Sequence, residues 1–240
     1  MRILLIGYGK MGQTIEKIAI ERGHTISGTI GIENVDDLYK YNSTNTDVAI
    51  EFTQPEAAFN NLKHCFENGI KVICGTTGWL DHKPQADAIC NEKNGAFLYG
   101  SNFSIGVNIF FHLNKVLAKL MNNFPNYDVE MEEIHHTQKL DAPSGTAITL
   151  AEGVIENFSG KKTWVNESTT NASEIFIKSL REGTVPGTHT TIYKSEIDKI
   201  EIKHTAHSRQ GFAQGAVVAA EWIADKNGVF SIEDMLKFGN

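Results

Sequence analysis

The sequence predicts an α/β fold made of a parallel-sheet domain and a smaller α+β domain with an open mixed sheet. In residues 1–104, short apolar runs alternate with helical patterns, which is the signature of βαβ units. In residues 105–208, the later apolar runs follow one another without helices between them, which favours a mixed or antiparallel sheet. The helical pattern of Ala213–Asp225 is expected to return to the first domain, so that residues 209–240 complete it.

The elements of the first domain follow from apolar runs and from the residues that end them. Short runs rich in branched and aromatic residues predict the strands Ile3–Ile6, His24–Ile30, Val48–Phe52, Ile70–Cys74 and Ala96–Tyr99. A helix is expected over Gly12–Arg22, where Gly23 ends it. A second helix can start at Pro55, because proline fits the first helical turn. A polar helix is expected over residues 81–93.

The second domain opens with a long helix, Ile105–Asn122, in which apolar residues recur every three or four positions. A strand over Val129–Ile134 carries acidic residues at alternate positions, and a further helix covers Ala147–Asn157. The polar stretch Lys161–Ser173 is expected to be a mobile loop. The remaining apolar runs predict the strands Glu174–Leu180, Thr188–Tyr193 and Lys199–Thr205.

Composition excludes several classes of function. The chain has 240 residues, 41% of them hydrophobic, and a formal net charge of −7. No global basic field therefore draws it to nucleic acid or to anionic lipid. No apolar run reaches the ~20 residues that a membrane span needs, and the N-terminus lacks a signal-peptide core, so a cytoplasmic protein is expected. Three cysteines without CxxC spacing, Cys65, Cys74 and Cys90, argue against a disulfide framework or a thiolate zinc site.

A glycine-rich turn directly follows the first strand and opens the first helix. It fits the pattern G-x-G-x-x-G and consists of Gly7, Tyr8, Gly9, Lys10, Met11 and Gly12. Such glycines allow a tight turn, close approach of a pyrophosphate and close packing of helix on strand, so the turn predicts a Rossmann-like dinucleotide site. A plain strand–helix turn is the alternative. No cation stands at Gly31–Asn34, where a 2′-phosphate would lie, so the cofactor is NADH or NADPH with NADH favoured.

Two further turns follow predicted parallel strands, where ligands of open α/β sheets bind. Their small and polar residues suit a nicotinamide and its ribose, and the ring of Phe103 is a candidate to pack on the nicotinamide. The candidate cofactor residues here are Gly75, Thr76, Thr77, Gly100, Ser101, Asn102 and Phe103. Simple turns without a ligand are the alternative.

The segment Glu133–Ala147 gathers the residues suited to proton transfer and anion binding. His135, His136 and Lys139 supply proton donors and positive charge. Pro143 lies where a helix can begin, so the amides of Gly145 and Thr146 are expected to point outward and form a candidate carboxylate site. Ser144 is a further candidate substrate-binding residue. A metal site is not expected, because adjacent histidines without a further ligand at helical spacing match no common zinc pattern.

These motifs, in this order and over nearly the whole chain, resemble the 4-hydroxy-tetrahydrodipicolinate reductase (dihydrodipicolinate reductase) family of lysine and diaminopimelate biosynthesis. The most specific part is the block His135–Ala147, in which His-His-x-x-Lys is followed by Asp-Ala-Pro-Ser-Gly-Thr-Ala. The matching segments elsewhere are the glycine turn, Glu51–Pro55, Gly75–Gly78, Asn102–Asn108 and Arg181–Gly183.

The resemblance implies that the candidate cofactor residues contact a nicotinamide cofactor and that the substrate is a small cyclic dicarboxylate. It implies proton transfer by His135 and Lys139, substrate binding by His136, Gly145 and Thr146, and a homotetramer built through the second domain's sheet. Gly31 and Ile32 stand where many members carry an acid and a base, and Gln54 replaces a residue that is often basic.

Two other functions remain open from the sequence. One is another nicotinamide enzyme of amino-acid metabolism, such as a homoserine- or semialdehyde-type dehydrogenase, against which the cationic block speaks. The other is a non-catalytic dinucleotide sensor, which leaves that block without a role. Oxidation of reduced cofactor on addition of substrate separates an enzyme from a sensor.

Overall fold

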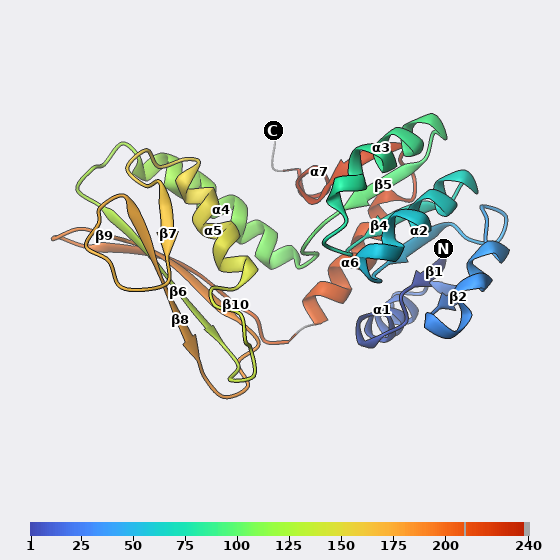
Figure 1. Ribbon diagram of the computed structural model, residues 1–240, viewed down its shortest axis with the longest axis horizontal. Coiled ribbons are helices and arrows are strands. Elements are labelled where there is room, and N and C mark those ends of the chain that lie inside the picture. The colour runs from blue at the N-terminus through green and yellow to red at the C-terminus, as the bar shows by residue number, and fades with distance from the viewer. Residues whose placement is uncertain (209, 238–240) are drawn as a thin grey trace. The chain divides into compact units, whose positions relative to one another are not determined.

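The computed structural model describes residues 1–208 and 210–237 (Figure 1). Within it the chain divides into two compact units, one formed by Met1–Ile105 and Gln210–Asn240 and the other by Gly106–Arg209. Each unit has its own sheet and its own hydrophobic core.

The sheet of the first unit is parallel throughout, as the sequence predicted, in the order β11-β5-β4-β3-β1-β2. Its strands are β1 (Arg2–Ile6), β2 (Thr25–Ile30), β3 (Val48–Glu51), β4 (Lys71–Cys74), β5 (Ala96–Tyr99) and β11 (Gly228–Ser231). The edge strand β11 has no counterpart among the predicted strands. It is short, and its pairing with β5 exists only because the C-terminal segment returns to this unit.

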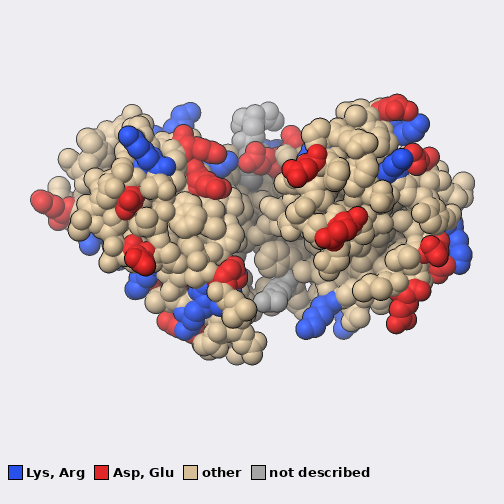
Figure 2. All heavy atoms as spheres, viewed as in Figure 1, with Lys and Arg blue, Asp and Glu red and all other residues tan. Residues whose placement is uncertain are grey.

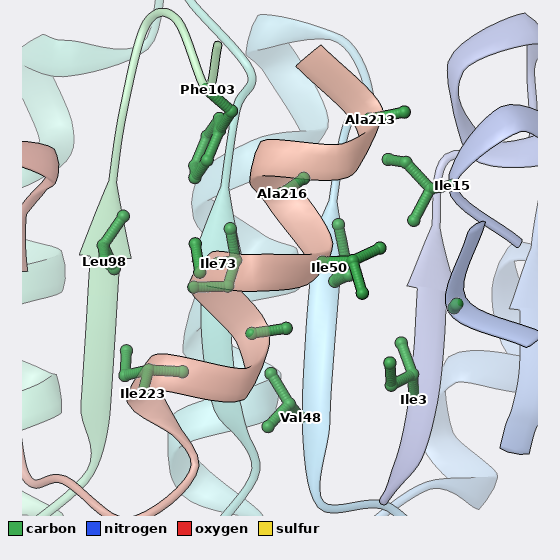
Figure 3. Packing of buried hydrophobic residues seen from close by; sticks show 14 of the residues in the cluster. Ile3, Ile15, Val48, Ile50, Ile73, Leu98, Phe103, Ala213, Ala216 and Ile223 are labelled. Atoms are coloured by element: carbon green, nitrogen blue, oxygen red, sulfur yellow. The ribbon is translucent and has the colours of Figure 1, made fainter. Parts of the chain in front are cut away.

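Helices cover both faces of this sheet, so its strands are buried on both sides. The helices are α1 (Lys10–Glu21), α2 (Pro55–Glu67), α3 (Lys83–Glu92), α6 (Gln210–Ile223) and α7 (Ile232–Leu236), with 3₁₀ segments η1 (Ile32–Lys40) and η2 (Leu80–His82). Alternate residues of β1 face opposite layers. Ile3 and Leu5 pack with α1 and α6, and Figure 3 shows Ile3 in this cluster. Leu4 and Ile6 pack with α2 on the other face.

Helix α6 lies close to the sheet because its inner face is made of small residues, Ala213, Ala216, Ala219 and Ala220 among them. Gly215 marks the tightest approach. A Cβ atom at this position would lie 1.7 Å from the carbonyl oxygen of Phe103. The residue thus brings the C-terminal helix against the turn that follows β5.

The second unit has a mixed sheet in the order β10-β9-β6-β8-β7. Strand β9 is antiparallel to both its neighbours, and β8 is parallel to both of its own. The elements are α4 (Ile105–Met121), β6 (Asp128–His135), α5 (Gly145–Ile155), β7 (Thr163–Val165), β8 (Glu174–Arg181), β9 (Thr188–Lys194) and β10 (Lys199–Thr205). The predicted open mixed sheet is confirmed.

Helices α4 and α5 pack on this sheet through one apolar cluster. The buried side chain of Asn114 in α4 ties the layers together. Its amide donates to the carbonyl of Leu150 in α5, and its oxygen accepts from the hydroxyl of Thr191 in β9, each at 2.9 Å. A polar group at this depth is stabilised because both of its ends are hydrogen bonded.

The polar stretch Lys161–Ser173 is not the mobile loop that its composition predicted. It contains β7, which pairs with β8, and Trp164 packs against the apolar cluster. Lys161 is 4% exposed, and its ammonium group donates to the carbonyl of Glu174 at 2.8 Å and lies 2.5 Å from a carboxylate oxygen of Asp128. The polar composition led to the wrong prediction because these polar side chains form hydrogen bonds and ion pairs within the segment and with its neighbours.

Basic and acidic side chains are interspersed on the face shown in Figure 2. Across residues 1–208 and 210–237, helices that combine the length and the apolar character needed to cross a membrane are absent.

We expect Gly215→Ala to lower the free energy of unfolding by about 1–3 kcal/mol, because the added methyl group overlaps the Phe103 carbonyl. The matched control is Gly211→Ala in the same helix, where the nearest heavy atom, Oγ of Ser104, would lie 3.6 Å from the new Cβ. Denaturant unfolding followed by circular dichroism measures both. Equal midpoints for the two variants would contradict this account of α6.

Candidate functional site

The turns after β1, β3, β4 and β5 share the carboxyl edge of the parallel sheet. The strand order reverses between β1 and β3, since β2 lies on one side of β1 and the later strands lie on the other. Ligands of open α/β sheets bind outside the carboxyl ends at such a point. All of the predicted cofactor residues lie at this edge.

The glycine turn has the geometry that a dinucleotide requires. Gly7 has a φ of +99°, and a Cβ there would lie 1.9 Å from the carbonyl oxygen of Phe52. A Cβ on Gly12 would lie 2.3 Å from the carbonyl oxygen of Gly7, so helix and turn pack closely. At Gly9, by contrast, the space is open. Because Gly9 is also the N-cap of α1, a phosphate can approach the helix N-terminus there.

A buried carboxylate, Glu51, fixes the next two turns. Its side chain is fully buried and accepts hydrogen bonds from the hydroxyls of Thr53 and Thr76, the latter at 2.8 Å. The hydroxyl of Thr76 in turn accepts from the amide of Thr53 at 2.7 Å. Thr76 therefore holds the turns after β3 and β4 together, and the exposed Thr77 beside it is the side chain that faces solvent.

The turn after β5 departs from the sequence-based expectation in one respect. Phe103 is 2% exposed and packs against Phe52 with ring centroids 5.7 Å apart. Its ring therefore belongs to the core and lacks the free face that stacking on a nicotinamide needs. Ser101 is the exposed side chain of this turn, and Asn102 accepts from the amide of Ser104 at 2.9 Å.

The cationic block of the second unit is built on the register of its sheet. Glu133 and His135 are two residues apart in β6 and so face the same side. Directly opposite Glu133 lie His189 of β9 and Ser179 of β8, and Arg181 lies opposite His135. Residues that are distant in sequence thus meet around Glu133.

Helix α5 begins beside this row. Ser144 is its N-cap and its hydroxyl accepts from the amide of Ala147. The amide of Ser144 donates to both carboxylate oxygens of Glu133 at 3.1 Å, and its hydroxyl lies 3.1 Å from Nε2 of His189. Gly145 and Thr146 are the first two residues of the helix, whose amides have no intrahelical acceptor. They remain the candidate carboxylate site.

Lys139 lies in the segment between β6 and α5, where Arg181 holds the main chain. The guanidinium donates to the carbonyls of Lys139 at 3.2 Å and of Asp141 at 2.5 Å. The ammonium group of Lys139 pairs with the exposed carboxylate of Asp141 at 2.7 Å. His136 is half-buried at the start of this segment. The structure therefore brings His135, Lys139 and the start of α5 into one unit, apart from the cofactor residues in sequence and in fold.

Burial and charge shift two pKa values strongly in this cluster. Burial lowers the pKa of His135 to about 4, with Glu133 opposing this shift and His189, Lys139 and Arg181 adding to it. Burial by itself would raise the pKa of Glu133. Hydrogen bonds from His189, Ser144 and Ser179 outweigh it and hold that pKa below its usual range.

Glu133, His135 and His189 also have donor atoms within 4.8 Å of one another, a spacing that a metal ion could share. The carboxylate, however, already accepts from Ser144 and from the hydroxyl of Ser179 at 2.8 Å, and Arg181 lies 3.5 Å away. We therefore interpret the group as a hydrogen-bonded ion network and not as a set of metal ligands.

The sequence analysis assigned no role to Glu133, His189 or Glu51. For Glu133 a signal existed, because the two-residue period of β6 places it on the buried face with Val129, Met131 and His135. His189 could be found only through the register of β9 against β6. Glu51 ends a short apolar strand, where a carboxylate is conspicuous but has no obvious partner in sequence.

Comparison with known proteins links both units to one family. The model described as "Dihydrodipicolinate reductase, N-terminus" matches residues 1–103, and the one described as "Dihydrodipicolinate reductase, C-terminus" matches residues 106–236. A 4-hydroxy-tetrahydrodipicolinate reductase of Christiangramia forsetii is 53% identical over 238 residues, covering 98% of each chain. One from Neisseria gonorrhoeae is 35% identical, covering 94% of this chain and 85% of its own.

Among solved structures, the dipicolinate-bound dihydrodipicolinate reductase of Paenisporosarcina sp. TG-14 superposes with a TM-score of 0.79. It is 22% identical and covers 96% of this chain and 97% of its own. A likeness at this identity supports the fold.

The lowered pKa of His135 predicts a loss of stability in mild acid. The folded protein binds the proton near pH 4 and the unfolded chain near 6.5, so the unfolded state takes up more protons between these values. We expect the free energy of unfolding to fall by on the order of 2 kcal/mol from pH 6.5 to pH 4.5. Glu133 adds a loss only below its ordinary value of 4.5.

Denaturant unfolding at several pH values measures this dependence. His135→Asn should flatten it, and His207→Asn, which changes an exposed histidine of the same unit, should not. The same slope in wild type and His135→Asn would show that other groups carry it.

Proposed function

Because this chain belongs to the dihydrodipicolinate reductase family, we propose that it reduces 4-hydroxy-tetrahydrodipicolinate to tetrahydrodipicolinate with loss of water. It is an oxidoreductase of lysine and diaminopimelate biosynthesis that depends on a nicotinamide cofactor. The observation that carries the proposal is the placement of a buried histidine, a lysine and a helix N-terminus in one folded unit, next in the chain to a dinucleotide-binding unit.

The first unit binds the cofactor. Gly7–Gly12 receive the pyrophosphate at the start of α1, and the turns at Gly75–Thr77 and Gly100–Phe103 hold the nicotinamide and its ribose. NADH is favoured, because Gly31–Asn34 after β2 offer no cation to a 2′-phosphate. Lys10 in the glycine turn is exposed and is the substitute that NADPH would need. The bound cofactor supplies the hydride.

The second unit binds the substrate. The amides of Gly145 and Thr146 at the start of α5 accept one carboxylate, and Ser144 fixes their direction by capping the helix. His136 adds a further polar contact. A dipicolinate-bound structure exists for a relative of the same fold, which supports a flat dicarboxylate as the ligand class.

His135 and Lys139 handle the proton. The overall reaction replaces a hydroxyl with a hydride, and the hydroxyl leaves as water after it accepts a proton. His135 is neutral in the free protein, since burial lowers its pKa to about 4. A dianionic substrate beside it favours the imidazolium, so the proton arrives with the substrate. Lys139 is the second donor, and its pairing with Asp141 is exposed enough to exchange for a substrate group.

The proposal includes assembly as a homotetramer through the sheet of the second unit and a cytoplasmic location. The outer strand β10 supports the first point, because it is an edge strand with exposed residues along most of its length.

A coupled assay tests the proposed function. Freshly generated 4-hydroxy-tetrahydrodipicolinate is added with NADH or NADPH in turn, and loss of reduced cofactor is followed by absorbance. Turnover with either cofactor supports the proposal, and no turnover with both rejects it. A strong preference for NADPH would reject the inferred NADH preference alone.

In this assay we expect Lys139→Ala to lower turnover by about 10²–10⁴-fold, the usual contribution of a positioned proton donor. Cofactor affinity should stay unchanged. Lys178→Ala is the matched control, because Lys178 also pairs with an acid, Glu132, but on the exposed surface. Near wild-type turnover in Lys139→Ala would remove this lysine from the mechanism.

The carboxylate site predicts how dipicolinate binds. A Cβ at Gly145 meets open space, so Gly145→Val should leave the fold intact and yet block the approach of a ligand to the helix N-terminus. We expect its dissociation constant for dipicolinate to rise at least about tenfold, an effect of roughly 1.4 kcal/mol. Thr146→Val keeps the amide and should weaken binding less. Calorimetry measures both, and equal losses would place the carboxylate elsewhere.

A further inference from the structure

The buried carboxylate of Glu133 has no role in the reaction as described so far. Its side chain is fully buried in the second unit, between β9, β8 and the start of α5. The amide of Ser144 and the hydroxyl of Ser179 donate to it, and Nε2 of His189 lies 3.6 Å from Oε2. An ionised carboxylate at this depth is retained only with such partners.

One side of this carboxylate faces His135. Oε2 of Glu133 lies 3.4 Å from Nδ1 of His135. Nδ1 is buried and, among the residues that the structure describes, accepts or donates no hydrogen bond, so the 3.4 Å contact is an ion-pair distance only. Hydrogen bonds of catalytic groups are often long in a ligand-free protein and shorten when the ligand binds. The carboxylate is therefore the acceptor available to a proton on Nδ1.

The other ring nitrogen, Nε2, lies near Gly187. A Cβ at Gly187 would lie 3.2 Å from Nε2 and 3.4 Å from the adjacent ring carbon, and the glycine has a φ of +156°. A side chain at this position would crowd the ring edge. Because residue 187 is a glycine, space remains beside Nε2. Nδ1 is the ring nitrogen near Glu133, and Nε2 is the one farther from it.

The charges around His135 come from every element packed against it. His189 from β9, Arg181 from β8 and Lys139 from the following segment all disfavour a proton on the ring. Glu133, on the same face of β6, is the group among the described residues that favours it. In the free protein this carboxylate therefore opposes the loss of the proton that burial and the neighbouring cations favour.

We propose that Glu133 is a positioning residue for His135: it holds the proton of the neutral ring on Nδ1, directs Nε2 to the substrate and stabilises the imidazolium. The proposal rests on the proton-transfer role proposed for His135. The carboxylate itself stays ionised throughout, as the acid partner of a carboxylate–histidine pair does in general. Glu133 also accepts hydrogen bonds from the amide of Ser144, at the start of α5. The same carboxylate therefore positions both the proton donor, His135, and the candidate carboxylate site.

Nuclear magnetic resonance of the ligand-free protein tests the first part without any substrate. With ¹⁵N-labelled histidine, the ring nitrogens of His135 report the tautomer and its titration. We expect the proton on Nδ1 in the wild type. In Glu133→Gln we expect the pKa of His135 to fall by about one unit or more, because an opposite charge nearby is lost.

Enzyme kinetics test the second part. In Glu133→Gln we expect kcat to fall at least about tenfold with KM for substrate changed much less. The alkaline limb of the kcat–pH profile, where His135 loses the proton that it donates, should move to lower pH. Glu133→Asp keeps the negative charge but places it farther from His135, because the side chain is one methylene shorter. This variant should therefore lose less kcat and shift the pH profile less than Glu133→Gln. Glu132→Gln is the control, because it removes the same charge from the neighbouring residue, which pairs with Lys178 at the surface.

A proton on Nε2 in the wild type would overturn the proposal, as would an unchanged titration of His135 in Glu133→Gln. Equal loss of kcat in Glu132→Gln would do the same. If Glu133→Gln does not fold, the tautomer in the wild type and the titration in Glu133→Asp still decide. Failure of the proposed function looks different, since the wild type would then not turn over substrate while these resonances would be unaffected.

Discussion

The ionised carboxylate of Glu133 is the constraint on which the second unit's site depends. A buried charge is costly unless polar groups surround it, and here these come from separate segments. Ser179 in β8 and the main chain at Ser144 donate hydrogen bonds, and Nε2 of His189 in β9 lies 3.6 Å away. Satisfying one charge therefore sets the register of three strands and the point where α5 begins. The placement of His135 and of the helix N-terminus follows from that arrangement.

The first unit uses the same device at its own edge. Glu51 ends β3 fully buried, and its hydroxyl donors Thr53 and Thr76 belong to the turns after β3 and β4. Turns of small residues would otherwise be free to adopt several conformations. Because hydroxyls from both turns bond to the same carboxylate, the turns are held in one of these conformations. In both candidate sites a buried acid near the carboxyl end of a strand thus orders residues that would touch the ligands, Thr76 in one and Ser144 in the other.

The sequence could predict the elements whose pattern is local. The parallel sheet could be predicted from its apolar runs, and the glycine turn could be predicted because Gly7 and Gly12 each meet a close approach that the structure displays. What escaped prediction depends on contacts between distant segments. Strand β11 depends on its pairing with β5. Strand β7 lies in a polar stretch whose only apolar pair is Trp164 and Val165. His189 joins the site only through the register of β9 on β6.

The protein carries a net negative charge, but the groups around His135 include positive side chains that suit an anionic substrate. Burial disfavours a permanent proton on the ring of His135, and His189, Lys139 and Arg181 add to this effect, so the free protein keeps His135 neutral. A dicarboxylate introduces the negative charge that this environment lacks. In the proposed mechanism, protonation of His135 is linked to substrate binding, with Glu133 supplying the fixed part of the stabilisation and the substrate the variable part. Such a site would hold no extra buried positive charge between turnovers, and the proton would be present when the leaving hydroxyl needs it.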